Sequence, residues 1–170
     1  GLDNINLDTT NPEKELDKRH AVNLIIDLCL SNDKVTLITI GPLTNIAMAL
    51  KLEPKIISHI ELRSCMGGSI KLGNITPSAE FNIYGDPEAA QIVFSSGIEN
   101  IKMNGLDVTL PTHTDEKIVE RFKKIKTKSC EMFLNCMKNI GDLVYKFFGV
   151  QSAAMHDSVA VISVIDDSVV

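Results

Sequence analysis

The chain has 170 residues, of which 44% are hydrophobic, and a formal net charge of −5 at pH 7. This length and apolar content suit the core of one α/β domain, which we predict over residues 1–170. The acidic balance argues against a nucleic-acid partner, and the apolar runs are too short to cross a membrane. The four dispersed cysteines lack metal-binding spacing, as expected of inert thiols in a cytoplasmic protein.

Helix and strand signals alternate along the chain. The predicted elements, in chain order, are a helix from about Pro12 to residue 31, a strand over 35–40, a helix over 43–51, a strand over 60–66, a helix over 86–96, a strand or strand-and-loop over 101–108, a long helix over 114–138, a shorter helix near 143–148 and a last helix from about His156. This alternation predicts a mostly parallel sheet with helices on both faces, a Rossmann-like open α/β fold. Ligand sites in such sheets lie beyond the carboxyl ends of the strands, here at residues 40–42, 66–68 and the loop to Glu80.

The densest polar segment is GNITPSAEFN, residues 73–82. It places Asn74, Glu80 and Asn82 among apolar or small residues. On an extended backbone, Glu80 and Asn82 would project to the same side. A carboxylate accepts hydrogen bonds and an amide both donates and accepts, so this set suits a ligand rich in hydroxyl groups, such as a ribose. The alternative is that these residues cap turns and the helix that follows.

A second candidate pair, His156 and Asp157, follows a run of small apolar residues and precedes the last helix. Asp157 would bind a cation while His156 acts on a substrate as a general acid. The alternative is that Asp157 is an ordinary N-cap and His156 a partly buried imidazole.

The third candidate is the turn IGPLTN, residues 40–45, between the strand at 35–40 and the next helix. Such a turn can offer a free backbone carbonyl or amide to a ligand. The alternative is that Thr44 or Asn45 caps the helix. The segment lacks the glycines of a phosphate-binding loop.

Taken in this order, these segments resemble the inosine-uridine nucleoside hydrolase family, and most of all its bacterial ribonucleoside hydrolases. The motifs that carry the resemblance are IGPLTNIA (40–47), MGGS (66–69), GNITPSAEFN (73–82), DPEAA (86–90), GLDVT (105–109) and MHD (155–157). The resemblance covers the chain from Val35 onward. It implies an α/β enzyme that hydrolyses the N-glycosidic bond between the ribose and the base of a nucleoside.

The resemblance also implies which residues bind the sugar. Asn74, Glu80 and Asn82 would hold the ribose hydroxyls, and Met66 would pack against the sugar. Breaking the bond leaves positive charge on the ribose, as in glycoside hydrolysis generally, and Glu80 would stabilise that charge.

A metal and an acid complete the implied site. The backbone carbonyl of Ile40 and the carboxylate of Asp157 would be two ligands of a bound Ca²⁺, which positions and acidifies the attacking water. His156 would protonate or hydrogen-bond the leaving base. Its place directly before Asp157 is similar to the subgroup that prefers inosine and uridine.

One departure from the family concerns the metal. The family's aspartate cluster, of the form DTDPGxDD, has no match here, because Asp3 and Asp8 lack a preceding apolar strand. The family also continues beyond Val170. We therefore expect a piece of a parent hydrolase that lacks both ends of the domain. Alone it should bind Ca²⁺ poorly and be inactive, because Ca²⁺ takes about six to eight oxygen ligands.

Two other hypotheses compete with the enzyme. One is a truncated or degenerate protein that binds ribose or a nucleoside without chemistry, and the other is a structural α/β piece of an oligomer. The expected partner is a ribonucleoside, and the resemblance implies a homodimer or homotetramer for the full-length protein.

Overall fold

The computed structural model describes residues 16–149 and 153–169. The chain divides into two compact units, which we call the sheet unit (Lys18–Leu110 with His156–Val170) and the helical unit (Gly1–Asp17 with Pro111–Met155). The single domain expected over residues 1–170 stays a prediction, and the helix start expected near Pro12 lies outside the described residues. In the part that is described, no helix has both the length and the apolar character that crossing a membrane requires.

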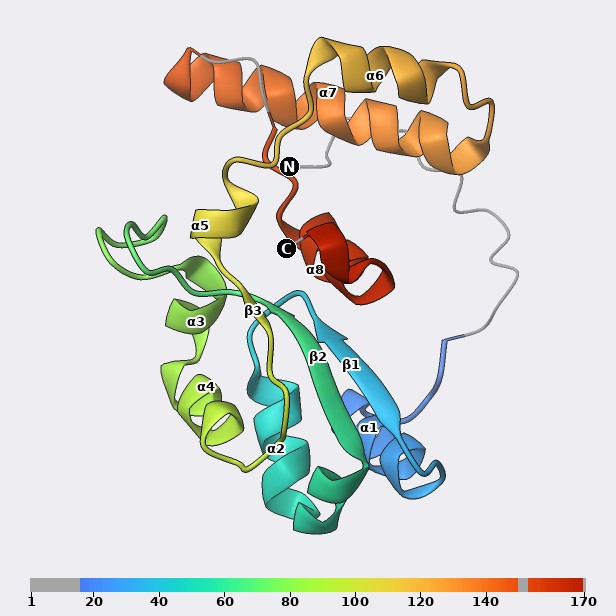
Figure 1. Ribbon diagram of the computed structural model, residues 1–170, viewed down its shortest axis with the longest axis vertical. Coiled ribbons are helices and arrows are strands. Elements are labelled where there is room, and N and C mark those ends of the chain that lie inside the picture. Colours follow the sequence, from blue (N-terminus) through green and yellow to red (C-terminus); the bar gives the residue numbers. More distant parts are fainter. Residues whose placement is uncertain (1–15, 150–152, 170) are drawn as a thin grey trace. The chain divides into compact units, whose positions relative to one another are not determined.

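The sheet unit contains a three-stranded parallel sheet with strand order β1-β2-β3 (Figure 1). β1 (Val35–Thr39) pairs with β2 (Ile60–Met66), with a register shift after Leu37. The short strand β3 (Met103–Asn104) pairs with the last two residues of β2. The side chains of β1 are half-buried except for Thr36, which is exposed, so this strand is less covered than its apolar run suggests.

Helices cover both faces of this sheet, which confirms the predicted α/β class. Cys65 belongs to a large buried cluster, whereas its neighbour Met66 belongs to a smaller one with Leu106 and Ala160. Adjacent strand residues point to opposite faces, so the two clusters lie on opposite sides of β2. Four helices contribute to the large cluster: α1 (Ala21–Leu30), α2 (Thr44–Leu52), the 3-10 helix η1 (Pro54–His59) and α4 (Pro87–Phe94). The smaller cluster includes a residue of α8 (His156–Ile165). A short 3-10 helix, η2 (Asp167–Val169), follows α8.

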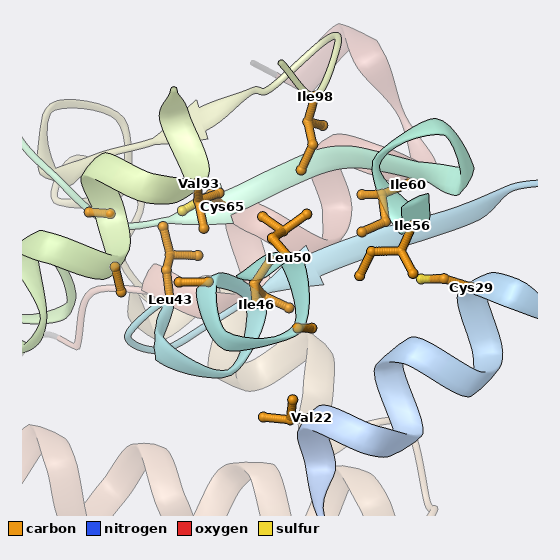
Figure 2. Close-up of a cluster of buried hydrophobic side chains, with 14 residues drawn as sticks. Val22, Cys29, Leu43, Ile46, Leu50, Ile56, Ile60, Cys65, Val93 and Ile98 are labelled. Carbon is orange, nitrogen blue, oxygen red and sulfur yellow. The ribbon is translucent and has the colours of Figure 1, made fainter. Parts of the chain in front are cut away.

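The large cluster is the core of the sheet unit (Figure 2). Ile56 and Val93 are completely buried in it, and burying a side chain of this size contributes about 1.5–3 kcal/mol. Cys29 and Cys65 are free thiols in the same cluster, and burial raises the pKa of both. These two thiols are therefore poor nucleophiles, as the sequence predicts.

The segment predicted as a strand over 101–108 is mostly not a strand. After β3 the chain forms the short helix α5 (Leu106–Thr109). Leu106 N donates to Gly68 O at 2.9 Å, so the start of α5 is bonded to the segment that follows β2. A second short helix, α3 (Phe81–Gly85), precedes α4.

The helical unit also differs from the prediction. The helix expected over 114–138 is two helices, α6 (Glu116–Lys123) and α7 (Lys128–Phe148), and the break expected before residue 143 is absent. Thr127 caps α7 by accepting a hydrogen bond from Cys130 N at 3.3 Å, which is why a new helix begins here. The two helices pack through the rings of Phe122 and Phe133, whose centroids are 4.5 Å apart.

Candidate active site

A buried carboxylate lies at the carboxyl end of β2. Glu80 is 2% exposed, and it accepts hydrogen bonds from Gly68 N at 2.9 Å, Asn82 N at 2.9 Å and Ile83 N at 3.1 Å. Three backbone donors therefore hold one carboxylate in a fixed position. A charge-assisted bond of this kind is stronger than a neutral one and compensates for the burial of the charge.

The backbone around Glu80 differs from the extended segment predicted for Glu80 and Asn82. Glu80 is the N-cap of α3, and Asn82 lies in the first turn of that helix. The alternative that Glu80 caps the following helix is therefore confirmed as a structural fact. A cap satisfies N–H groups that have no partner inside the helix, which is the reason the chain turns here instead of continuing as a strand.

Asn82 and Met66 are brought together beside this carboxylate. Asn82 Nδ2 donates to Met66 O at 3.1 Å and lies 3.2 Å from Met66 Sδ. Within the described residues, Asn82 Oδ1 has no hydrogen-bond partner, so it can accept from a ligand. The geometry unites three of the four residues expected to bind the sugar, although their roles stay predictions.

Asn74 joins the same group through the loop over residues 73–79. Its Oδ1 accepts from Phe81 N at 2.9 Å, and its backbone N–H donates to Ala79 O at 3.1 Å. The loop is tight at Gly73, where a Cβ would come within 2.3 Å of Ala79 O, so only glycine fits. Asn74 is consequently held next to the start of α3, because its partner Phe81 is the residue that follows Glu80.

His156 and Asp157 form the first turn of α8. His156 Nδ1 and Thr109 Oγ1 share a hydrogen bond of 2.8 Å, and the side chain of Asp157 is exposed. Asp157 lies inside the helix instead of at its N-cap, so the capping alternative is wrong. In the first turn its carboxylate interacts favourably with the positive end of the helix dipole.

The turn after β1 contains Ile40, which is the first residue beyond the strand. Neither Thr44 nor Asn45 caps α2, because the N-cap is Leu43, which makes no side-chain capping bond. The Thr44 hydroxyl instead donates to Asp86 Oδ2 at 2.6 Å.

Asp86 caps the next helix, α4, as the sequence predicts. It accepts from Ala89 N at 3.0 Å, and Pro87 occupies the first turn. The hydrogen bond from Thr44, followed by the bond from Ala89 N, lowers the pKa of the Asp86 carboxyl.

The Ca²⁺ site that the resemblance implies stays a prediction. Among those residues, no group of three or more His, Cys, Asp and Glu side chains could hold a metal ion. Ile40 can offer only its backbone carbonyl, and Asp157 only one exposed carboxylate. Two oxygen ligands are far fewer than the about six to eight that Ca²⁺ takes.

Three residues near the strand ends were not identified from the sequence. Asp107 accepts from Ile70 N at 2.6 Å, a bond that lowers the pKa of its carboxyl, and Thr109 contacts His156. Both lie in the GLDVT motif, which was the available signal. Asn104 gave no signal, because its partners lie far away in the sequence.

Asn104 forms a completely buried polar group with two serines. Its Nδ2 donates to Ser64 Oγ at 2.8 Å and to Ser163 Oγ at 3.3 Å. Its Oδ1 is buried and finds no hydrogen-bond partner among the residues that the structure describes. The group joins β2, β3 and α8 directly beneath the strand ends.

A parallel sheet with a fixed buried carboxylate and amides at its strand ends defines a class of α/β proteins that bind polar ligands there. The family model of the inosine-uridine preferring nucleoside hydrolases matches residues 1–170. The chain belongs to this family.

Individual relatives agree with this assignment. The chain is 42% identical over 159 residues to the inosine-uridine preferring nucleoside hydrolase of Crithidia fasciculata, covering 92% of this chain and 50% of that protein. It is 36% identical over 149 residues to the pyrimidine-specific ribonucleoside hydrolase RihB of Shigella flexneri, covering 87% and 47%. The structure of a purine-preferring ribonucleoside hydrolase from Gardnerella vaginalis superposes with a TM-score of 0.83 at 31% identity, covering 92% and 50%. The chain thus spans about half the length of the curated relatives it matches.

Proposed function

We propose that the whole protein hydrolyses the N-glycosidic bond of ribonucleosides and releases ribose and a free base. Membership of the family supports this proposal. The observation that carries it is the buried Glu80 carboxylate beside Asn82 and Met66 at the end of β2.

Glu80 suits a reaction in which positive charge develops on the sugar. The carboxylate is buried and held by backbone N–H groups, so it need not reorganise as the charge forms. A fixed charge in a water-poor site stabilises an oxocarbenium-like transition state more strongly than a solvated one. Asn82 and Asn74 would orient the ribose hydroxyls against it.

His156 is our candidate for the acid that assists the leaving base. A purine or pyrimidine anion leaves poorly, and a proton donated to a ring nitrogen of the base lowers that barrier. Nδ1 of His156 is engaged with Thr109, whereas Nε2 has no partner within the described residues. Nε2 is thus the atom that can address the base.

A bound Ca²⁺ would supply a positioned, acidified water as nucleophile. We expect the Ile40 carbonyl and the Asp157 carboxylate to be two of its ligands. The described residues fit only part of such a site, so the other ligands must come from elsewhere. For the same reason we expect residues 1–170 alone to be inactive.

Ribose release from inosine and from uridine by the whole protein, with and without added Ca²⁺, tests the proposal. We expect release that depends on Ca²⁺, and the rates will assign the preference for the base. Calorimetric binding of ribose without any turnover would instead favour the non-catalytic binding protein. A chain of residues 1–170 that releases ribose rapidly would contradict the expected inactivity. Light scattering will decide between a homodimer and a homotetramer.

A further inference from the structure

One hydrogen bond joins two segments that the proposed chemistry does not connect. Thr109 is completely buried, and its hydroxyl lies 2.8 Å from His156 Nδ1. Whichever atom donates, the bond occupies Nδ1 and leaves Nε2 as the available ring nitrogen. It also restricts rotation of the imidazole about its two side-chain dihedral angles.

The helix that carries Thr109 is itself firmly held. Gly105 packs so closely that a Cβ there would come within 2.7 Å of Gly68 O. Leu106 N donates to that same oxygen at 2.9 Å, and Asp107 accepts from Ile70 N at 2.6 Å. α5 is therefore attached to the segment that follows β2.

The same segment holds the carboxylate of the sugar site, because Gly68 N donates to Glu80 Oε2. Gly68 thus bonds to Glu80 through its N–H and to α5 through its carbonyl. A continuous series of short contacts runs from Glu80 through Gly68 and α5 to His156. Such a series fixes the distance between the group that faces the sugar and the group that faces the base.

We propose that Thr109 is a positioning residue for the reaction: it orients the His156 imidazole so that Nε2 faces the leaving base. This inference rests on the proposed role of His156 as the acid. Thr109 would not touch the substrate. Its contribution would appear only for substrates whose leaving group needs a proton.

A pair of substrates with different leaving groups tests the proposal in the whole protein. Inosine needs assistance by an acid, whereas a nitrophenyl riboside releases a stable phenolate without it. Thr109→Val keeps the shape and removes the hydroxyl. We expect it to lower kcat for inosine about 10- to 100-fold, part of the ~10²–10⁴-fold that acid catalysis provides. We expect kcat for the nitrophenyl riboside, and KM for both substrates, to change less than about twofold.

Three variants make the test specific. Thr109→Ser restores the hydroxyl and should recover most of the inosine rate. Thr36→Val, on an exposed residue of β1, should change neither rate. Thr109→Val added to His156→Ala should lower the inosine rate no further, since coupled residues are not additive. If Thr109→Val does not fold, Thr109→Ala takes its place in the same comparison.

The outcomes separate this inference from the proposed function. An equal loss on both substrates, or no loss on inosine, would overturn the positioning role. If His156→Ala itself lowers the two rates equally, then His156 is not the leaving-group acid, and the inference falls with that assignment. If His156→Ala affects only inosine and Thr109→Val affects neither, the proposed function stands and only the inference is wrong.

Discussion

Glu80 and Asp157 are the two carboxylates expected to act on the substrate and the metal, and their surroundings are opposite. Glu80 is 2% exposed and accepts hydrogen bonds from three backbone N–H groups. Asp157 is exposed in the first turn of α8, and within the described residues it has no hydrogen-bond partner. The described residues therefore hold the Glu80 carboxylate in place, whereas they do not hold the Asp157 carboxylate.

This contrast indicates which of the two carboxylates is held in place before any ligand binds. The donors to Glu80 are fixed backbone groups, so its position depends on the folded loops and on no ligand. Asp157 is placed only by its helix, and no hydrogen bond from the described residues restrains its side chain. A hard cation that needs several oxygens can provide that restraint, and a lone exposed carboxylate cannot.

The largest expected effect comes from removing the charge of Glu80. In Glu80→Gln, the amide group cannot carry the negative charge, and its NH2 group replaces one of the two oxygens that accept from backbone N–H groups. We expect kcat/KM for ribose release to fall about 10²- to 10³-fold. The free energy of unfolding should also fall by about 1–3 kcal/mol, because buried N–H groups lose their acceptor.

Two matched variants sharpen this result. Glu99→Gln, on an exposed loop residue, should leave both quantities unchanged. Asp157→Asn should lower activity but change the free energy of unfolding by less than about 1 kcal/mol, the size of a helix-dipole effect. Equal stability losses in Glu80→Gln and Asp157→Asn would show that the two carboxylates do not differ as described.

A smaller effect is expected from the buried polar group that anchors α8. In Asn104→Ala, the bonds to Ser64 and Ser163 disappear and a cavity forms beneath the strand ends. We expect the free energy of unfolding, measured by chemical denaturation, to fall by about 1–3 kcal/mol. Hydrogen exchange should show that α8 loses more protection than α1.

Asn45→Ala is the control for Asn104, because Asn45 is exposed on α2. That variant should keep its stability or gain a few tenths of a kcal/mol from better helix propensity, on the order of the measured scale. Unchanged stability of Asn104→Ala would mean that the loss of the unpartnered Oδ1 offsets the two lost bonds.

The elements that depend on local signals were predicted well from the sequence. β2 occupies Ile60–Met66 as predicted, and α4 begins at the predicted Asp-Pro-Glu start, because a strand run and a capping residue are short-range features. The family motifs likewise identified the cluster of Glu80, Asn82 and Met66. Local patterns thus sufficed for the α/β class and for bringing these three residues together, and their binding of a sugar stays a prediction.

Several misses depend on contacts between distant residues, whereas the missed break before α7 is a local cap, in which Thr127 accepts from Cys130 N. α5 begins where Leu106 N donates to Gly68 O, and no propensity encodes a bond between residues so far apart in the sequence. Thr109 meets His156 across 47 positions, and Asn104 meets Ser163 across 59. Glu80 has the extended backbone that was predicted, but Asn82 lies in the first turn of α3, because Glu80 caps that helix through Asn82 N and Ile83 N.

The smallest expected effect concerns Asp86, which is half-buried and, like Glu80, accepts hydrogen bonds from its neighbours. The Thr44 hydroxyl and then Ala89 N lower the pKa of Asp86 below its ordinary value of 3.8. A carboxyl with a lowered pKa in the folded state stabilises the fold above its unfolded-state pKa. That contribution is lost as the pH falls through the folded-state pKa.

Thr44→Val removes the first of the two bonds, so its Tm should lie below that of the parent protein at neutral pH. The difference should shrink below about pH 4, as Asp86 becomes protonated in both proteins. Thr36→Val should show no such pH dependence. A Tm difference that persists unchanged to pH 2, measured by thermal melts, would mean that Thr44 acts through packing and not through the Asp86 carboxylate.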